Sequence, residues 1–278
     1  MDRRRFLLVA TVGADDIASD EFNRLLRSLG DQGVEIALHL VIRGEHRDST
    51  GLEPSWDGDL VLHSAAAGTS LSTARNIALR HIGTTGDLAH TDAIAFPDDD
   101  CWYPPHLLAR AGRLLTDWDV VMGSYSARPP HVNGERFPKV PAELDWRRAY
   151  ERTASVTQFY AAGAVRDVGP FDERFGAGAR YPSAEDADYL VRAIQRGWRC
   201  FYEPSLVVGH PEREAPNQGH YLGGTALLAK HAVRVQVARR LLVRRLLGGA
   251  RRTVTGALPP ATYARSLRAV VATFGRAV

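Results

Sequence analysis

The chain has 278 residues, 45% of them hydrophobic and 24% charged, a composition typical of a soluble protein with one large domain and an appendage. Its two cysteines, Cys101 and Cys200, lie far apart, which argues against a disulfide framework and favours a reducing, cytoplasmic location. No apolar run reaches the roughly 18 residues that a transmembrane helix needs.

The charge is distributed unevenly along the chain. The net charge is +3, yet residues 1–214 carry 24 Lys and Arg against 32 Asp and Glu. Residues 215–278 carry eleven Lys and Arg and no acidic residue. An acidic body with a basic extension indicates an anionic partner for the extension, such as a membrane, a polymer or a nucleic acid.

The first half of the chain alternates between expected strands and helices. Its start resembles a secretory signal peptide only briefly, because Asp15 and Asp16 follow the apolar run without a clear cleavage site, so a buried first strand is the better interpretation. The alternation predicts an α/β fold whose mostly parallel sheet has helices on both faces. We expect strands at 6–12, 34–42, 59–63, 91–96 and 119–123, and helices at 19–29, 68–82 and 105–115.

The second half is less regular. Residues 124–157 are rich in proline and aromatic side chains, which indicates an irregular excursion with one short helix near 142–152. After it we expect a return to the core at 159–164, a turn at 169–172, a flexible glycine loop at 176–178, an amphipathic helix from 183 to 194, short strands at 200–202 and 206–208, and mainly helix at 219–247.

Three adjacent carboxylates follow the strand at 91–96. Asp98, Asp99 and Asp100 come directly after Pro97, at the edge where the strands of an open α/β sheet present ligand sites. Like charges at this density repel one another and require a cation or hydrogen-bond donors. The triplet therefore indicates a divalent ion that bridges to phosphates, with an acidic turn that caps the next helix as the alternative.

Five segments carry a resemblance to a known family. They are TVG at 11–13, LSTARN at 71–76, PDDD at 97–100, FDERFGAGARYPSAEDADYLVRAIQRGW at 171–198 and YEPSLVVGH at 202–210. In this order they resemble the GT-A fold inverting glycosyltransferases of the family 2 type. The resemblance implies a GT-A (Rossmann-like) mixed, mostly parallel sheet flanked by helices, with a C-terminal helical extension. It also implies transfer of a sugar, with inversion, from a nucleotide-sugar donor to an acceptor hydroxyl on a glycan, a lipid-linked molecule or a small molecule.

The resemblance also divides the chain into domains. Residues 1–214 correspond to a GT-A catalytic domain, with a nucleotide-sugar-binding half at 1–123 and an acceptor-side half at 124–214. Residues 215–278 are then a basic helical extension.

A metal site is the first of the implied functional centres. The resemblance makes Asp100 a ligand, places Asp98 at the ion or at the ribose, and puts Asp99 beside the nucleotide. It also suggests His210 as a ligand, with a structural histidine at a strand end as the alternative. The ion is Mn²⁺ or Mg²⁺, and an imidazole ligand favours Mn²⁺. Such an ion acts as a Lewis acid on the departing diphosphate.

Further nucleotide contacts are implied at the ends of other elements. These residues are Thr11, Val12, Gly13 and Arg75. Arg75 either clamps phosphate or base, or pairs with one of the aspartates. Many relatives have a base-reading aspartate after the second strand, whereas here only Glu45 or Asp48 stands in, so the nucleobase is open.

The acceptor side depends on a pair of acids at a helix start. By resemblance Asp186 is the general base that takes the proton from the acceptor hydroxyl, and Glu185 binds the acceptor. The structural alternative is that Ser183 and Asp186 form a capping box. Trp102 and Tyr103 either stack on a sugar ring or pack in the core, and the glycine loop at 176–178 is a candidate lid.

The basic extension carries an apolar stripe at helical spacing. A helix with this pattern either docks on the catalytic domain or makes peripheral contact with the inner face of a membrane. The stripe contains Leu228, Val235, Leu242 and Leu246.

Two other functions were weighed against the sugar transferase. One is a metal-dependent nucleotidyltransferase, which is expected to carry a basic glycine-rich loop after the first strand, where residues 11–16 have one glycine and no basic residue. The other is a non-catalytic binder of an anionic polymer through the basic extension, which leaves the acidic triplet unexplained. We expect no nucleic acid partner.

Overall fold

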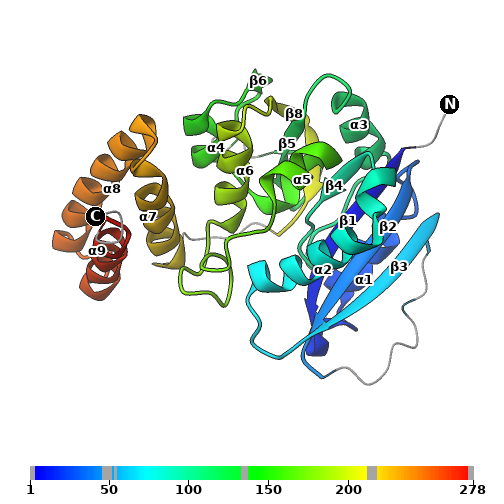
Figure 1. The fold of residues 1–278 in the computed structure, drawn as a ribbon, viewed down its shortest axis with the longest axis horizontal. Coiled ribbons are helices and arrows are strands. Elements are labelled where there is room, and N and C mark those ends of the chain that lie inside the picture. Colours follow the sequence, from blue (N-terminus) through cyan, green and yellow to red (C-terminus); the bar gives the residue numbers. More distant parts are fainter. Residues whose placement is uncertain (1–3, 46–51, 53–54, 133–136, 212–217, 275–278) are drawn as a thin grey trace.

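The computed structural model describes residues 4–45, 52, 55–132, 137–211 and 218–274. In these residues an eight-stranded sheet has the order β3-β2-β1-β4-β7-β5-β8-β6 (Figure 1). Strands β3, β2, β1 and β4 are parallel, as are β5 and β8, whereas β7 and β6 run antiparallel to their neighbours. The strands are β1 (Arg5–Gly13), β2 (Glu35–Arg43), β3 (Gly58–Ala65), β4 (Ala93–Ala95), β5 (Val120–Ser126), β6 (Ala142–Glu143), β7 (Gln158–Ala161) and β8 (Cys200–Gly209). The predicted mixed, mostly parallel sheet is confirmed.

Helices cover both faces of this sheet. Buried residues of α1 and α3 belong to one core cluster, and those of α2, α4, α5, α6 and α7 belong to the other. The α-helices are α1 (Asp20–Ser28), α2 (Leu71–Thr85), α3 (Leu107–Leu114), α4 (Trp146–Arg152), α5 (Ala162–Val168), α6 (Glu185–Gln195), α7 (Gln218–Ala232), α8 (Gln236–Val254) and α9 (Pro260–Phe274). Short 3-10 turns occupy Ala14–Asp16, Asp87–His90 and Ser155–Thr157.

Strand β1 is a continuous apolar run because both of its faces are buried. Leu7 and Val9 face the core cluster of α2, while Phe6 and Leu8 face that of α1 and α3. Since both faces of a central parallel strand are covered, both sets of alternating side chains have to be apolar. The expected first strand is therefore confirmed.

Strand β8 corrects the expectation of two short strands at 200–202 and 206–208. One strand spans both, and its pairing with β5 shifts register between Met122 and Ser124. The extra residues of β8 bulge beside Gly123, where an added Cβ would lie 2.1 Å from the carbonyl oxygen of Leu206. A bulge of this kind bends a strand without ending it, which the sequence pattern alone does not reveal.

The segment at 219–247 is mainly helical, as expected, but it is divided between two helices, and a third helix follows. Helices α7, α8 and α9 gather at the end of the molecule opposite β3 (Figure 1). Helix α7 packs against both α8 and α9, and its apolar side chains join the core cluster of α6. None of the described helices is both long and apolar enough to cross a membrane. Both cysteines are buried free thiols.

Candidate active site

A cavity of about 940 Å³ opens at the carboxyl edge of the sheet. Side chains that are far apart in the sequence meet in its wall. They include the predicted residues Thr11, Asp98, Asp99, Asp100, Glu185, Asp186 and His210. The two acidic groups, one after β4 and one at the start of α6, therefore face a single cavity.

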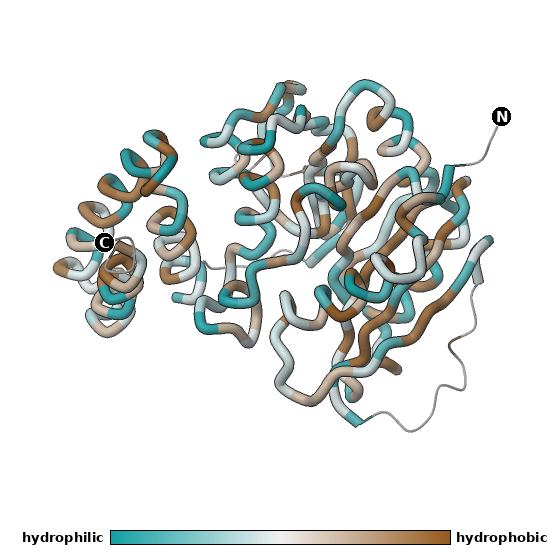
Figure 2. Tube along the Cα trace, viewed as in Figure 1, coloured by the Kyte–Doolittle hydropathy of each residue, from teal (hydrophilic) through white to brown (hydrophobic). Residues whose placement is uncertain are grey.

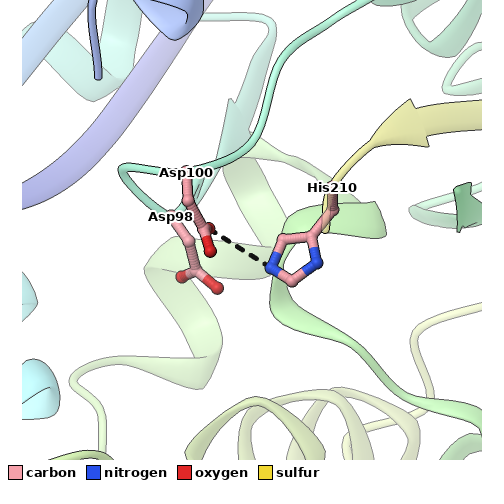
Figure 3. Close-up of side chains that lie close together, drawn as sticks. All are labelled: Asp98, Asp100 and His210. Carbon is pink, nitrogen blue, oxygen red and sulfur yellow. Dashed lines mark ion pairs between the residues drawn. The ribbon is translucent and has the colours of Figure 1, made fainter. Parts of the chain in front are cut away.

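Asp98, Asp100 and His210 form a compact cluster in this wall. The aspartates stand on the turn after β4, and the imidazole projects toward them from the end of β8 (Figure 3). One ligand atom from each residue can be chosen so that all three atoms lie within 4.8 Å of one another. Two carboxylates and an imidazole are a donor set that suits Mn²⁺, and one ion can contact all three.

A backbone bridge holds the two parts of this cluster together. The Trp102 N–H donates to the Gly209 carbonyl at 2.9 Å, and the Gly209 N–H donates to the Trp102 carbonyl at 2.8 Å. The indole ring packs directly over Gly209, where an added Cβ would lie 2.0 Å from the ring. Gly209 directly precedes His210, and Trp102 follows Asp100 by two residues. The bridge therefore brings Asp100 and His210 side by side. Trp102 therefore has a packing role, which was one of the two roles expected for it.

His210 is oriented by its other ring nitrogen. Its Nδ1 lies 2.7 Å from the carbonyl oxygen of Pro211, which can only accept a hydrogen bond, so Nδ1 carries a proton. Its Nε2 lies 3.3 Å from Oδ1 of Asp100. Burial lowers the pKa of His210, but the hydrogen bond and charge of Asp100 more than offset this, and the pKa is raised. The hydrogen bond from Nδ1 to the Pro211 carbonyl fixes Nε2 as the nitrogen that a metal would use.

Arg75 is buried beneath the cavity, in the first turns of α2. Its Nη2 donates to Oδ1 of Asp98 at 2.9 Å, and its Nη1 lies 3.9 Å from Oε1 of Glu185. The hydroxyl of Ser155 donates to the Asp98 carboxylate at 3.2 Å. The structure thus shows the aspartate ion pair that was the alternative for Arg75, and this arginine links the two acidic groups.

Helix α6 begins differently from the expected capping box. Its N-cap is Ala184, with φ of 75° and no side-chain capping hydrogen bond. The Ser183 hydroxyl donates instead to the carbonyl of Gly219 in α7, at 3.0 Å. A left-handed alanine is strained, and such strain concentrates at functional sites. The capping-box alternative is therefore wrong, although the dipole of α6 still favours acidic residues in its first turn.

The pKa values of the two acids at the start of α6 are raised. Burial and the charge of Asp186 raise the pKa of Glu185 to about 7, against the opposing effect of Arg75. Burial also raises the pKa of Asp186, although the Ala187 N–H donates to its Oδ1 at 2.8 Å and the Thr153 hydroxyl to its Oδ2 at 3.2 Å. Carboxylates with raised pKa values in a cavity are candidates for proton transfer.

Arg43 is a site residue that the sequence reasoning missed. It ends β2, lines the cavity, and has a buried Nε that makes no hydrogen bond in the described structure. Burial and the neighbouring Asp100 and Asp98 carboxylates raise the pKa of Asp99 to about 6, while the charge of Arg43 opposes the shift. The sequence did indicate Arg43, because it lies at the end of an apolar strand. At this strand end only acidic residues, Glu45 and Asp48, were considered as nucleotide contacts.

The other residues that were expected to contact the nucleotide differ in how deeply they are buried. Thr11 lines the cavity, whereas the side chain of Val12 is buried in the core cluster of α1. Gly13 ends β1 beside Asp16, whose carboxylate lies 2.7 Å from the position of an added Cβ. Glu45 is exposed just after β2, and Asp48 lies outside the described residues.

The far wall of the cavity comes from the C-terminal extension, which the sequence did not reveal. Arg245 of α8 donates to the Tyr150 hydroxyl at 3.0 Å and to the Thr225 hydroxyl at 3.0 Å. Its guanidinium lies 4.8 Å from the ring centre of Tyr221. Arg252 and the turn that follows α8 complete this wall. Helices α7 and α8 therefore help to shape the site.

The glycine loop at 176–178, the candidate lid, contacts the start of α2, and its role as a lid stays a prediction. The Leu71 N–H donates to the carbonyl of Ala177 at 2.9 Å, which ties the loop to the start of α2. Gly176, with φ of 105°, has Glu185 within 3.4 Å of an added Cβ. The loop supports the floor of the cavity beside α6.

Tyr103 is buried in the core, so its role, like that of Trp102, is packing.

Neither a family model nor a curated protein matches the chain. Solved structures do resemble it. Residues 1–349 of S. aureus TarS in complex with UDP-GlcNAc match with a TM-score of 0.65 and 16% identity, over 97% of this chain and 80% of that one. A longer TarS structure matches with a TM-score of 0.60 and 18% identity, over 83% of this chain, which spans only 40% of the TarS chain.

A second protein has the same architecture. The mannosyltransferase PcManGT from Pyrobaculum calidifontis, in complex with GDP-Man and Mn²⁺, matches with a TM-score of 0.56 and 15% identity, over 99% of this chain and 88% of that one. At such identities the likeness concerns the fold. The chain thus has the GT-A-like fold of glycosyltransferases, with a mixed, mostly parallel sheet between helical layers.

Proposed function

We propose that the chain is an inverting glycosyltransferase of the family 2 type, which moves a sugar from a nucleotide-sugar donor to an acceptor hydroxyl. The observation that carries the proposal is the shared cavity, in which the cluster of Asp98, Asp100 and His210 and the acids Glu185 and Asp186 face the same space. A leaving-group site and a base in one cavity are what direct displacement requires.

The donor would lie on the side of the acidic triplet. Asp98, Asp100 and His210 would hold Mn²⁺ or Mg²⁺, which when bound neutralises charge on the diphosphate as a Lewis acid. Arg43 and Thr11 lie at the ends of the neighbouring strands and would contact the nucleotide. The structures of the similar folds with UDP-GlcNAc, and with GDP-Man and Mn²⁺, support a donor of this class.

The acceptor would lie on the side of α6. Asp186 would take the proton from the acceptor hydroxyl as that oxygen attacks the anomeric carbon, while the nucleoside diphosphate leaves with the bonding electron pair. The two hydrogen bonds to the Asp186 carboxylate fix its orientation and leave a lone pair on each oxygen for this proton. Glu185 would bind the acceptor. The halves 1–123 and 124–214, with the extension 215–278, are the corresponding domain proposal.

A comparison of two variants tests these roles separately. We expect Asp100→Ala to lose metal-dependent binding of UDP and GDP, measured by calorimetry with and without Mn²⁺. We expect Asp186→Asn to keep that binding and to lose transfer by about 10²-fold or more, measured as nucleoside diphosphate released from a donor panel. Asp117→Ala, at an exposed aspartate outside the cavity lining, is the matched control and should change neither quantity.

Two outcomes would reject the proposal. Equal loss of nucleotide binding in Asp100→Ala and Asp186→Asn would show that the roles are not separate. Release of pyrophosphate in place of nucleoside diphosphate would favour the nucleotidyltransferase.

A further inference from the structure

Helix α8 carries an apolar stripe that is exposed to solvent in the described structure. Val243, Leu247 and Val254 are 53%, 69% and 88% exposed. Their spacing of four and seven residues places them on one side of the helix. The opposite side, with Ala238 and Leu242, is buried. Helix α8 is thus apolar on both its inward and its outward face.

Helix α9 repeats this arrangement. Leu267, Val271 and Phe274 are 38%, 70% and 38% exposed, and their spacing of four and three residues again defines one side. Ser266 and Ala269 are buried on the other side. Figure 2 shows hydrophobic segments along both helices at the C-terminal end of the molecule. Exposed apolar stripes on neighbouring helices are typical of an interaction surface.

Arginines accompany both stripes. Arg240, Arg244 and Arg251 are exposed on α8, as are Arg265 and Arg268 on α9. With 3.6 residues per turn, Arg240 and Arg251 lie within a quarter turn of Leu247 on the helix surface. Residues 215–278 contain no Asp or Glu that could neutralise this charge. The surface therefore combines apolar residues that can insert with cations that attract anions.

We propose that α8 and α9 bind the surface of a membrane rich in anionic lipids, with the two apolar stripes at the level of the headgroups. A second copy of this chain would bring two uniformly basic surfaces together, which is electrostatically unfavourable. A nucleic acid would pair with the arginines but would leave Leu247, Val254 and Val271 exposed to water. An anionic lipid surface is the partner that satisfies both features.

Helix α8 would lie between the lipid surface and the cavity. Arg245 and Arg252 line the cavity. With 3.6 residues per turn, they lie on the side of α8 opposite Leu247 and Val254. The membrane contact itself does not depend on the proposed reaction.

Sedimentation with vesicles tests the proposal on the full chain without any donor. We expect binding to vesicles of phosphatidylcholine with ~30% phosphatidylglycerol, and at least about tenfold weaker binding to pure phosphatidylcholine, because each basic residue near an anionic surface contributes about fivefold. Binding should largely disappear in 1 M NaCl, where the Debye length falls to about 3 Å.

A pair of matched double variants isolates the apolar contribution. Leu247→Ser with Val254→Ser leaves the charge unchanged and should weaken vesicle binding about tenfold or more. Leu62→Ser with Val140→Ser is the control, since these residues are 41% and 70% exposed elsewhere on the molecule, and it should bind as the unmodified chain does. Circular dichroism should show the same helix content for all three proteins.

Three outcomes would overturn the proposal. The first is equal binding to charged and uncharged vesicles, or none to either. The second is undiminished vesicle binding by the Leu247 and Val254 double variant. The third is a stable oligomer, or an RNA complex, that is lost in the double variant of α8 while vesicle binding is absent.

Discussion

At the scale of single residues, Arg75 connects the two ends of the proposed reaction. Its guanidinium is fully buried and lies between Asp98 after β4 and Glu185 at the start of α6. Without this cation, the neighbouring carboxylates would repel one another more strongly, and the pKa of Glu185 would rise further. A guanidinium keeps its charge in such a setting, whereas a buried lysine can lose it. Arg75 is thus a structural counter-ion for the site.

The pair of Glu185 and Asp186 leads to a pH prediction. Because burial raises both pKa values, and that of Glu185 to about 7, the pair takes up a proton as the pH falls through about 7. A protonated base cannot accept the acceptor's proton, so transfer should be lost on the acidic side and gained as the pH rises. The profile of kcat/KM against pH measures this.

The conservative variant Glu185→Gln is the control for this prediction. It removes one negative charge beside Asp186, so the acidic limb of its profile should lie at lower pH than that of the unmodified chain. An acidic limb at the same pH in both proteins would mean that another group controls it.

At the scale of elements, the bridge between Trp102 and Gly209 decides whether the metal ligands meet. We expect Gly209→Ala to weaken Mn²⁺ binding, because its Cβ would lie 2.0 Å from the indole ring and would push the end of β8 away from Asp100. Overpacking of this kind costs about 1–3 kcal/mol of stability. Calorimetry with Mn²⁺ and a melting curve measure the two effects.

A second substitution makes this prediction specific. Trp102→Ala in the Gly209→Ala background removes the clash, so part of the Mn²⁺ affinity should return. Additive losses in the double variant would show that the indole is not the cause.

Helix α7 is attached to α6 by a buried ionic network. Asp188 accepts hydrogen bonds from Lys230 Nζ at 2.6 Å, His231 Nε2 at 2.9 Å and Arg192 Nε at 2.9 Å. Asp188 lies two residues beyond Asp186, so the network positions the helix that carries the proposed base.

We expect Asp188→Asn to destabilise the chain by about 3 kcal/mol, because it leaves the largely buried Arg192 without its anion, whereas Lys230 keeps Asp172. Burial alone would raise the pKa of Asp188, but His231, Lys230 and Arg192 lower it to about 2. Its contribution is therefore complete above the unfolded pKa of about 4 and disappears as the pH falls toward 2. Urea unfolding at pH 7 and at pH 3 measures this.

The exposed pair of Arg147 and Glu151 on α4 provides the comparison. Its N–O distance is 3.0 Å, yet both side chains are largely in solvent, so Glu151→Gln should cost less than about 0.5 kcal/mol. A similar cost for both variants would show that the network on α6 contributes little.

At the scale of the whole molecule, one cavity joins the sheet edge to the C-terminal helices. Its walls include Asp99 and Arg43 on one side and Arg252 and Tyr221 on the other. Both the residues before α7 and the C-terminal helices must therefore be folded for the cavity to be complete. Ligands that bind here should stabilise the entire chain.

Thermal unfolding tests this expectation. UDP or GDP at about a hundred times its Kd should add about 2.7 kcal/mol of stability in the presence of Mn²⁺. For a chain of this size, that corresponds to a rise in Tm of about 5–10 °C. EDTA should abolish the rise, and Asp100→Ala should never show it. A rise that persists in EDTA would argue against a metal between Asp100 and the diphosphate.

Much of the sheet edge was determined by the sequence itself. The buried strand before Asp98, the helix that begins at Glu185 and the His210 that follows an apolar strand are local patterns, and chain direction alone brings the ends of parallel strands together. The set of Asp98, Asp100 and His210 was expected from the resemblance to family 2 type glycosyltransferases, and in the structure these three residues meet.

Only the tertiary structure decided which partners these residues have. The pairing of Arg75 with Asp98, the bulge that unites β8, the left-handed Ala184 and the cavity wall around Arg245 all depend on contacts between distant segments. Periodicity reports which face of an element is buried, but not which element covers it. The role of the basic extension as part of the site therefore emerged only once α7 and α8 were placed beside α6 and α4.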